Sequence, residues 1–118
     1  ILMMAECYLE LDDTDNAMRY LNMVKDRAQI ARYETFKNYD HLHEEIERER
    51  ARELFGEFQR KYDLVRWGSW YRQTFDYTDY KSLQDNILPC HEYYPIPDKE
   101  VTYSGNALDN DAYAEWGL

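Results

Sequence analysis

The strongest constraint on the fold of this chain is a pair of adjacent segments in which apolar residues recur every three or four positions. In the first segment, residues 1–12, Leu2, Ala5, Tyr8 and Leu9 follow this spacing with the neighbouring Ile1 and Met4, which places side chains on one face of an α-helix. After a short polar turn the spacing returns, at Ala17, Tyr20, Leu21, Val24 and Ala28. Two helices joined so closely must pack antiparallel. The sequence therefore predicts a helical hairpin over residues 1–30.

Small and large residues alternate in this hairpin with the spacing of a tetratricopeptide-like unit, in which small side chains let two helices approach closely. An ordinary helical hairpin remains an alternative, because a single unit cannot display a repeat period. Asp12 and Asp13 are predicted to end the first helix, and Thr14 or Asp15 to cap the second. Since Ile1 already belongs to the apolar face, we expect the chain to be a fragment of a larger protein.

A second, longer helix is predicted from about His41 to about Tyr62, with Asp40 as its cap. Acidic and basic residues run along it at spacings of three or four, which is the spacing of facing side chains on a helix. These residues are Glu49, Arg50, Glu53, Glu57, Arg60 and Asp63. Such a run forms either a solvated face of weak ion pairs or a buried network.

The remaining segment, residues 69–118, lacks a sustained helix or strand period. Tyr93-Tyr94-Pro95-Ile96-Pro97 is predicted to be extended, because a residue that precedes proline is pushed out of the helical region. Asp98 can begin a short helical turn, and the turn-forming residues from Gly105 to Asn110 are expected to cross the helices without forming one. The predicted fold is mainly α, with a hairpin, a long helix and a loop-rich tail.

Composition excludes several classes of function. A chain of 118 residues with 44% hydrophobic residues has the size and content for one core. Its 24 acidic and 14 basic residues give a net charge of -10, which argues against binding to nucleic acid or to an anionic membrane surface. No apolar run reaches the roughly 20 residues of a membrane-spanning helix. Cys7 and Cys90 have no metal or redox spacing, and we expect them to be unlinked.

Residues 49–68 read E-R-A-R-E-L-F-G-E-F-Q-R-K-Y-D-L-V-R-W-G. This string resembles the E-R-x-x-E-L-x-x-E-x-x-R-x-x-D-L-x-R-W-G signature of the SusD/RagB family of bacterial surface nutrient-binding lipoproteins. Tyr94-Pro95-Ile96-Pro97-Asp98-Lys99-Glu100 is similar to the family's Y-P-I-P-x-x-E segment, and the run from Asn106 to Asn110 to its closing N-x-L-x-Q-N run. Phe58 departs from the family, which commonly has glycine there. We therefore assign residues 41–68 as the signature helix.

The resemblance implies the C-terminal part of a protein that is lipid-anchored on the outer face of the outer membrane. Such a protein captures an oligosaccharide or peptide and passes it to a SusC-like TonB-dependent transporter, without catalysis and without a cofactor. Its lipid anchor would lie outside this chain, and most of its ligand contacts would come from other parts of the protein. This chain is then expected to be mainly scaffold.

Two sets of residues follow as candidates. Arginine can bond carboxylates or main-chain carbonyls in a fork, which predicts a structural network of Glu49, Arg50, Glu53, Glu57, Arg60, Asp63, Arg66 and Trp67. In it, Arg60 is expected to be buried and to tie the long helix to the Pro-Ile-Pro tail. Sugar rings pack on aromatic side chains, so the candidate ligand contacts are Trp70, Tyr71, Tyr77 and Tyr80. Packing in a core is the alternative role for these aromatic residues.

Other classes of function fit the sequence less well. A carboxylate-pair hydrolase could use Glu53 and Glu57 on one helix face, but Arg50 and Arg60 would keep both ionised, and no catalytic residue is assigned. His41 and His43 cannot share a metal, because residues two apart on a helix do not face each other. A tetratricopeptide-type adaptor for a protein partner explains the hairpin but not the Pro-Ile-Pro tail.

Overall fold

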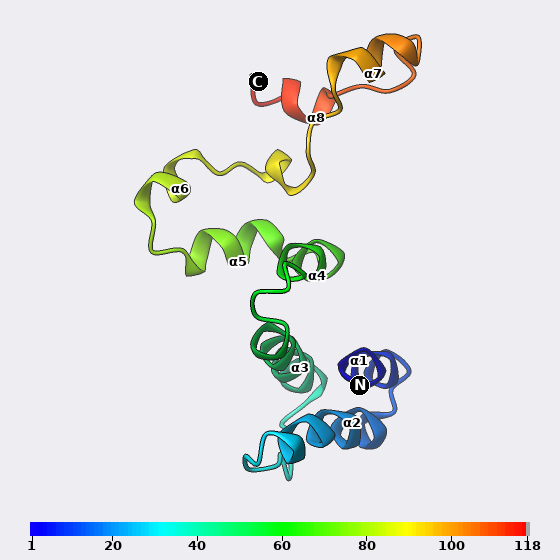
Figure 1. Ribbon diagram of the computed structural model, residues 1–118, viewed down its shortest axis with the longest axis vertical. Coiled ribbons are helices and arrows are strands. Elements are labelled where there is room, and N and C mark those ends of the chain that lie inside the picture. Colours follow the sequence, from blue (N-terminus) through cyan, green and yellow to red (C-terminus); the bar gives the residue numbers. More distant parts are fainter. Residues whose placement is uncertain (118) are drawn as a thin grey trace. The chain divides into compact units, whose positions relative to one another are not determined.

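The computed structural model describes residues 1–117, and these contain eight α-helices, one 3-10 turn and no strand (Figure 1). The mainly α fold predicted from the sequence is confirmed. The chain divides into two compact units, residues 1–60 and the residues from Lys61 onward. Each unit is described on its own.

The first unit begins with the predicted pair of helices, α1 (Leu2–Glu10) and α2 (Thr14–Arg27), which pack on each other. Asp12 adopts a left-handed backbone conformation in the turn, with φ of 58°. The carboxylate of Asp13 accepts the backbone N–H of Asn16 at 3.1 Å and so caps α2. The expected caps, Thr14 and Asp15, already belong to the helix. The helical assignment is confirmed, and its start lies one residue earlier.

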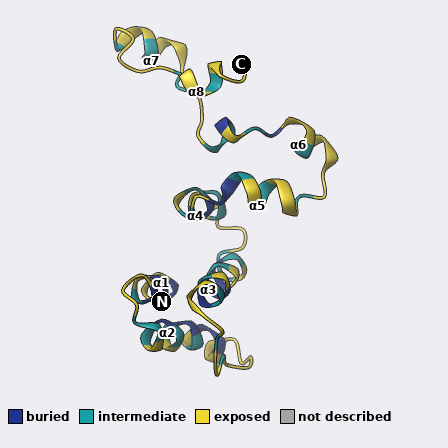
Figure 2. Ribbon diagram, turned by 180° about the vertical axis from the view of Figure 1, so that it is seen from behind, coloured by how far each residue is buried: buried dark blue, intermediate teal, exposed yellow. Residues whose placement is uncertain are grey.

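α3 (Tyr39–Glu53) packs on both helices of the hairpin and completes the core of this unit. Ala5 and Ala17 are fully buried, which is consistent with a close approach of the first two helices. The core consists of Leu2, Ala5, Leu9, Ala17, Leu21, Val24, Leu42 and Ile46, and it forms the dark faces of α1, α2 and α3 in Figure 2. Cys7 of α1 is exposed.

The single helix expected from about His41 to about Tyr62 is wrong. α3 ends at Glu53, and α4 (Arg60–Arg66) begins after a turn. In this turn Gly56 and Phe58 have φ of 80° and 58°, values that a right-handed helix cannot contain. The start was also misassigned, because Asn38 and not Asp40 caps α3, through an Asn38 Oδ1 bond from the N–H of His41 at 3.0 Å.

The second unit is more helical than the loop-rich tail that the sequence predicted. It contains α5 (Trp70–Tyr77), α6 (Lys81–Asn86), the 3-10 turn η1 (Pro89–Glu92), α7 (Asp98–Tyr103) and α8 (Asp111–Ala114). Proline favours two of these starts, because its fixed φ suits the first turn of a helix: Pro89 opens η1, and Pro97 precedes α7. Residues 105–110, which were expected not to form a helix, form none, and α8 follows them.

The buried core of the second unit is small. Leu64, Trp70 and Ile87 form it, and Val65, Trp67 and Tyr71 pack against it. Gly68, with φ of 64°, ends α4 in a Schellman arrangement, in which the N–H of Ser69 bonds the carbonyl of Leu64 at 2.9 Å. This turn brings the start of α5 onto α4 side chains, and it explains why Trp70 is buried beside Leu64.

Candidate functional site

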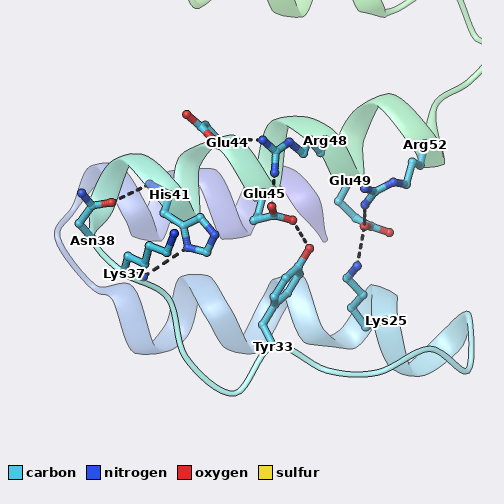
Figure 3. Close-up of polar contacts among 10 residues, drawn as sticks. All are labelled: Lys25, Tyr33, Lys37, Asn38, His41, Glu44, Glu45, Arg48, Glu49 and Arg52. Carbon is cyan, nitrogen blue, oxygen red and sulfur yellow. Dashed lines mark hydrogen bonds and ion pairs between the residues drawn. The ribbon is translucent and has the colours of Figure 1, made fainter.

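A buried ion pair joins α2 to α3 in the first unit (Figure 3). The Lys25 ammonium lies 3.1 Å from Glu49 Oε2, and both side chains are more than 90% buried. Glu49 also accepts a bond from Arg52 at 2.8 Å, and the Lys25 ammonium lies 4.5 Å from the centre of the Tyr33 ring. Burial lowers the pKa of Lys25, but bonds and attraction from Glu49 and Tyr33 outweigh it, so the pKa is raised. The lysine stays charged.

A second group links the loop after α2 to α3. The Tyr33 hydroxyl donates to the Glu45 carboxylate, which also accepts a bond from Arg48 (Figure 3). Burial raises the pKa of Glu45, but the bonds from Tyr33 and Arg48 outweigh it and the pKa falls below its ordinary value. Asn22 fixes Tyr33 by bonding both its backbone N–H and its carbonyl, each at 2.9 Å. Glu45 is therefore held ionised.

Several residues that were predicted to form one structural network bond to different partners in the structure. Glu49 and Arg50 are buried, and Glu53 pairs with Arg27 of α2. Asp63 is buried and pairs with Arg66 at 3.0 Å. The Arg66 guanidinium lies 4.7 Å from the centre of the Trp67 ring. The buried glutamates thus serve as structural partners within the fold.

The structure differs from two of the predictions about this network. Glu57 lies beyond the end of α3 and is exposed, so Glu53 and Glu57 do not share a helix face. The pair that a carboxylate hydrolase would need is therefore not assembled on one helix. Arg60 is half-buried, not buried, and its guanidinium donates to the carbonyl of Glu47 at 3.3 Å. Its tie to the Pro-Ile-Pro tail stays a prediction.

Sequence reasoning missed the partners that come from the hairpin, namely Lys25, Arg27 and Tyr33. A signal was present for one of them. Lys25 directly follows Val24 in the apolar stripe of α2, and it is as buried as its apolar neighbours. A lysine is almost never fully buried unless it is paired, so a charge beside a core position points to a carboxylate on a facing helix.

The four aromatic candidates fall into two classes. Trp70 is buried in the core of the second unit, and Tyr71 is half-buried with its ring centre 6.0 Å from that of Phe75. Tyr77 and Tyr80 are 81% and 75% exposed. The amide of Gln84 donates to the carbonyls of Phe75 and Thr78 at 3.2 and 3.3 Å, which holds the turn between these two tyrosines.

The Pro-Ile-Pro segment is held by an asparagine. Asn110 accepts the N–H of Ile96 at 2.8 Å and donates to its carbonyl at 2.9 Å. Both backbone groups of a residue between two prolines are thereby satisfied, although neither proline can donate a backbone bond. Tyr113 also donates its hydroxyl to the carbonyl of Tyr93. The two C-terminal motifs of the sequence therefore meet in one hydrogen-bonded structure.

Comparison with known proteins decides the family. The model of the SusD family matches residues 1–113. SusD-like protein P25 of Formosa agariphila is 39% identical over 116 residues, which cover 94% of this chain and 22% of that protein. This chain belongs to the SusD family. It spans about a fifth of the length of that relative, and no solved structure matches it.

Family membership confirms the resemblance drawn from the signature string, and the structure gives physical roles to its residues. In this SusD-family chain, Glu49 is the carboxylate that neutralises Lys25, and Asp63 holds Arg66. Phe58, the departure from the usual glycine, has a left-handed φ of 58° and is 90% exposed. Glycine suits that conformation because it has no Cβ to clash with the backbone.

Within residues 1–117 of this SusD-family chain, no helix is long and apolar enough to cross a membrane. No cluster of three or more metal-binding side chains is found there either. His41 accepts the N–H of Lys37 at 3.3 Å, and His43 faces Glu47 at 3.2 Å. Cys7 and Cys90 are free thiols, and Cys90 is buried within η1.

Proposed function

We propose that this chain is a scaffold portion of a surface nutrient-binding protein, and that it forms the C-terminal part of that protein. The complete protein would capture an oligosaccharide or peptide and deliver it to a SusC-like TonB-dependent transporter. It would be held at the outer face of the outer membrane by a lipid anchor elsewhere in its sequence. Membership of the SusD family supports this role.

The observation that carries the scaffold role is the use of carboxylates of α3 inside the fold. Glu49 bonds Lys25 and Arg52, and Glu45 bonds Tyr33 and Arg48. A general acid needs a carboxyl whose pKa is raised toward neutrality, whereas the pKa of Glu45 is lowered. Together with membership of the SusD family, this supports the proposal that the protein binds its ligand without chemical turnover.

The proposed ligand contacts within this chain are Tyr77 and Tyr80, the two original aromatic candidates that are exposed. Flat aromatic rings accept the apolar face of a sugar ring, and their hydroxyls reach its polar rim. Because Gln84 bonds the backbone of the turn between them, both rings would lose little conformational freedom when the ligand binds. Trp70 is supported less well, because its ring is packed on Leu64 and Ile87.

Calorimetric titration of the complete protein with a panel of oligosaccharides and peptides tests this proposal. Saturable binding to one class is expected, with no products in the same mixtures by chromatography. Copurification with a SusC-like transporter encoded beside the gene would support delivery. Turnover of a chromogenic glycoside that is lost in Glu53→Gln would contradict the non-catalytic role. Failure to bind any member of the panel would contradict the binding role.

A further inference from the structure

The Tyr94 side chain is highly exposed and has a cation packed on its ring. Its side chain is 80% exposed, yet the Lys61 ammonium lies 4.1 Å from the centre of the ring. Lys61 is itself held, because its ammonium lies 5.2 Å from the Trp70 ring and donates to the carbonyl of His91 at 3.3 Å. A cation on a ring face contributes about 0.5–1 kcal/mol at an exposed site. Tyr94 is thus restrained from one face.

The backbone around Tyr94 is restrained as well. On one side, Tyr93 donates its N–H to the carbonyl of Cys90 at 3.4 Å and accepts a bond from the Tyr113 hydroxyl. On the other side, Asn110 bonds both backbone groups of Ile96. Pro95 lies between these anchors and restricts both its own φ and the conformation of Tyr94. The exposed ring therefore stands on a segment fixed at both ends.

Other exposed tyrosines of the second unit lack this restraint. Within residues 61–117, Tyr77, Tyr80 and Tyr103 have similar exposure, but a cation packs on the ring of Tyr94 and not on theirs. Lys61 has no carboxylate partner in that part of the chain, although acidic residues outnumber basic ones in the sequence. The Lys61 ammonium thus contacts two aromatic rings and one carbonyl. Of the four tyrosines compared, Tyr94 is the one on which it packs.

We infer that Tyr94 is a stacking subsite for a saccharide ring, and that Lys61 and Asn110 position it. The inference rests on the proposed nutrient-binding function and adds a site to it. Lys61 packs on one face of the phenol ring, and in this proposal the C–H face of a pyranose packs on the other. The Tyr94 hydroxyl lies at the ring edge and can exchange hydrogen bonds with the sugar hydroxyls. A ring that is fixed before binding loses little entropy on binding.

The test is titration of the complete protein with maltohexaose, cellohexaose, xylohexaose and oligogalacturonate. For the sugar that binds, Tyr94→Ala is expected to weaken affinity about 3- to 10-fold, the contribution of one aromatic packing contact. Tyr94→Phe keeps the ring and should lie within about 2-fold of the wild type. Lys61→Met should weaken binding, and Lys61→Arg should restore it because arginine also packs on aromatic faces. Tyr103→Ala, at 79% exposure on α7, is the matched control and should bind like the wild type.

Different failures have different meanings. A wild type that binds no sugar of the panel would overturn both the saccharide role and this subsite. Wild-type affinity in Tyr94→Ala, with sugar binding intact, would overturn the subsite alone. A Tyr94→Ala variant with unchanged affinity but a lower melting temperature would show that another part of the protein covers the ring, which also overturns the inference. Equal losses in Tyr94→Ala and Tyr103→Ala would do the same.

Discussion

The two units of this chain differ in how their polar groups are hydrogen-bonded. In the first unit, three long helices satisfy their own backbone bonds, and side chains are free to bond one another across helices, as Lys25 does with Glu49. In the second unit, helices have at most eight residues and extended segments lie between them. There, side chains such as Asn110 and Gln84 bond the backbone itself.

This difference shows where each unit is vulnerable. Removing one charge from the first unit strands another charge in a low-dielectric interior. Removing one amide from the second unit strands backbone groups, which costs less per group. One feature common to both units is an asparagine that bonds the N–H and carbonyl of a single residue, Tyr33 in the first unit and Ile96 in the second.

The largest expected effect is on the buried ion pair. Glu49→Ala leaves the Lys25 ammonium without its carboxylate, and the free energy of unfolding of the first unit should fall by about 3–5 kcal/mol. Urea denaturation followed by circular dichroism measures it. Glu44→Ala is the control, because its pair with Arg48 is more than half exposed and contributes at most about 1 kcal/mol. Equal effects of the two substitutions would contradict the contrast between buried and exposed pairs.

A smaller effect is expected from the asparagine of the second unit. Asn110→Ala removes the partners of both backbone groups of Ile96, and each unpaired group costs about 1–3 kcal/mol when it is fully buried. Because Ile96 is half-buried, we expect a loss of about 1–2 kcal/mol in total. Faster hydrogen exchange at the Ile96 amide reports it directly. Asn110→Asp keeps the acceptor and should protect this amide better than alanine does; equal exchange in both variants would contradict the assignment.

The turn between α3 and α4 should respond in opposite directions to two substitutions. Phe58→Gly relieves a left-handed conformation that costs an L-residue about 1–2 kcal/mol, and after the added freedom of the unfolded chain a gain of roughly 0.5–1 kcal/mol is expected. Gly56→Ala should cost about 1 kcal/mol, although no atom lies within 4 Å of the added Cβ. Thermal unfolding measures both. A loss of stability in Phe58→Gly would mean that its exposed ring has a contact that stabilises the turn.

The smallest effect concerns Tyr39 of α3, whose hydroxyl donates to Glu10 of α1 at 2.7 Å. This bond, followed by burial, raises the pKa of Tyr39 to about 12. A raised pKa means that the stabilisation is complete below the unfolded value of about 10 and is lost as pH rises toward 12. Because the residue is partly exposed, the contribution is under about 0.5 kcal/mol. Ultraviolet titration of Tyr39→Phe should lose the most basic tyrosine; an unchanged curve would exclude this bond.

Sequence patterns predicted the regular part of this fold well. The apolar spacing correctly predicted that Leu2, Ala5 and Leu9 are buried, because burial on a helix follows its period. Ile1 and Met4 were placed on the same face but are exposed. Helix ends were less accurate, since several polar residues near a boundary can accept the same N–H. The break after Glu53 was missed because it depends on the left-handed backbone conformations of Gly56 and Phe58. The spacing of charged residues, from which the helix was predicted, does not predict these conformations.

The candidate sites were predicted only in part, for a related reason. The signature named Glu49 and Asp63 as structural residues, but Lys25 and Tyr33 come from a different segment, and periodicity within one helix cannot reveal a partner on another. Aromatic composition likewise did not separate Trp70, which is buried, from Tyr77, which is exposed. To distinguish the buried aromatic residue from the exposed one, the turn at Gly68, which places Trp70 beside Leu64, must be known.

A double-mutant cycle on Lys25 and Glu49 tests most directly whether the signature charges are a framework that holds α2 to α3. Lys25→Met and Glu49→Met should each lower the free energy of unfolding by about 3–5 kcal/mol, because each strands a buried charge. The double variant, which buries neither charge, should lie within about 1 kcal/mol of the wild type. Losses that simply add in the double variant would show that the two charges act independently, and would contradict the framework role.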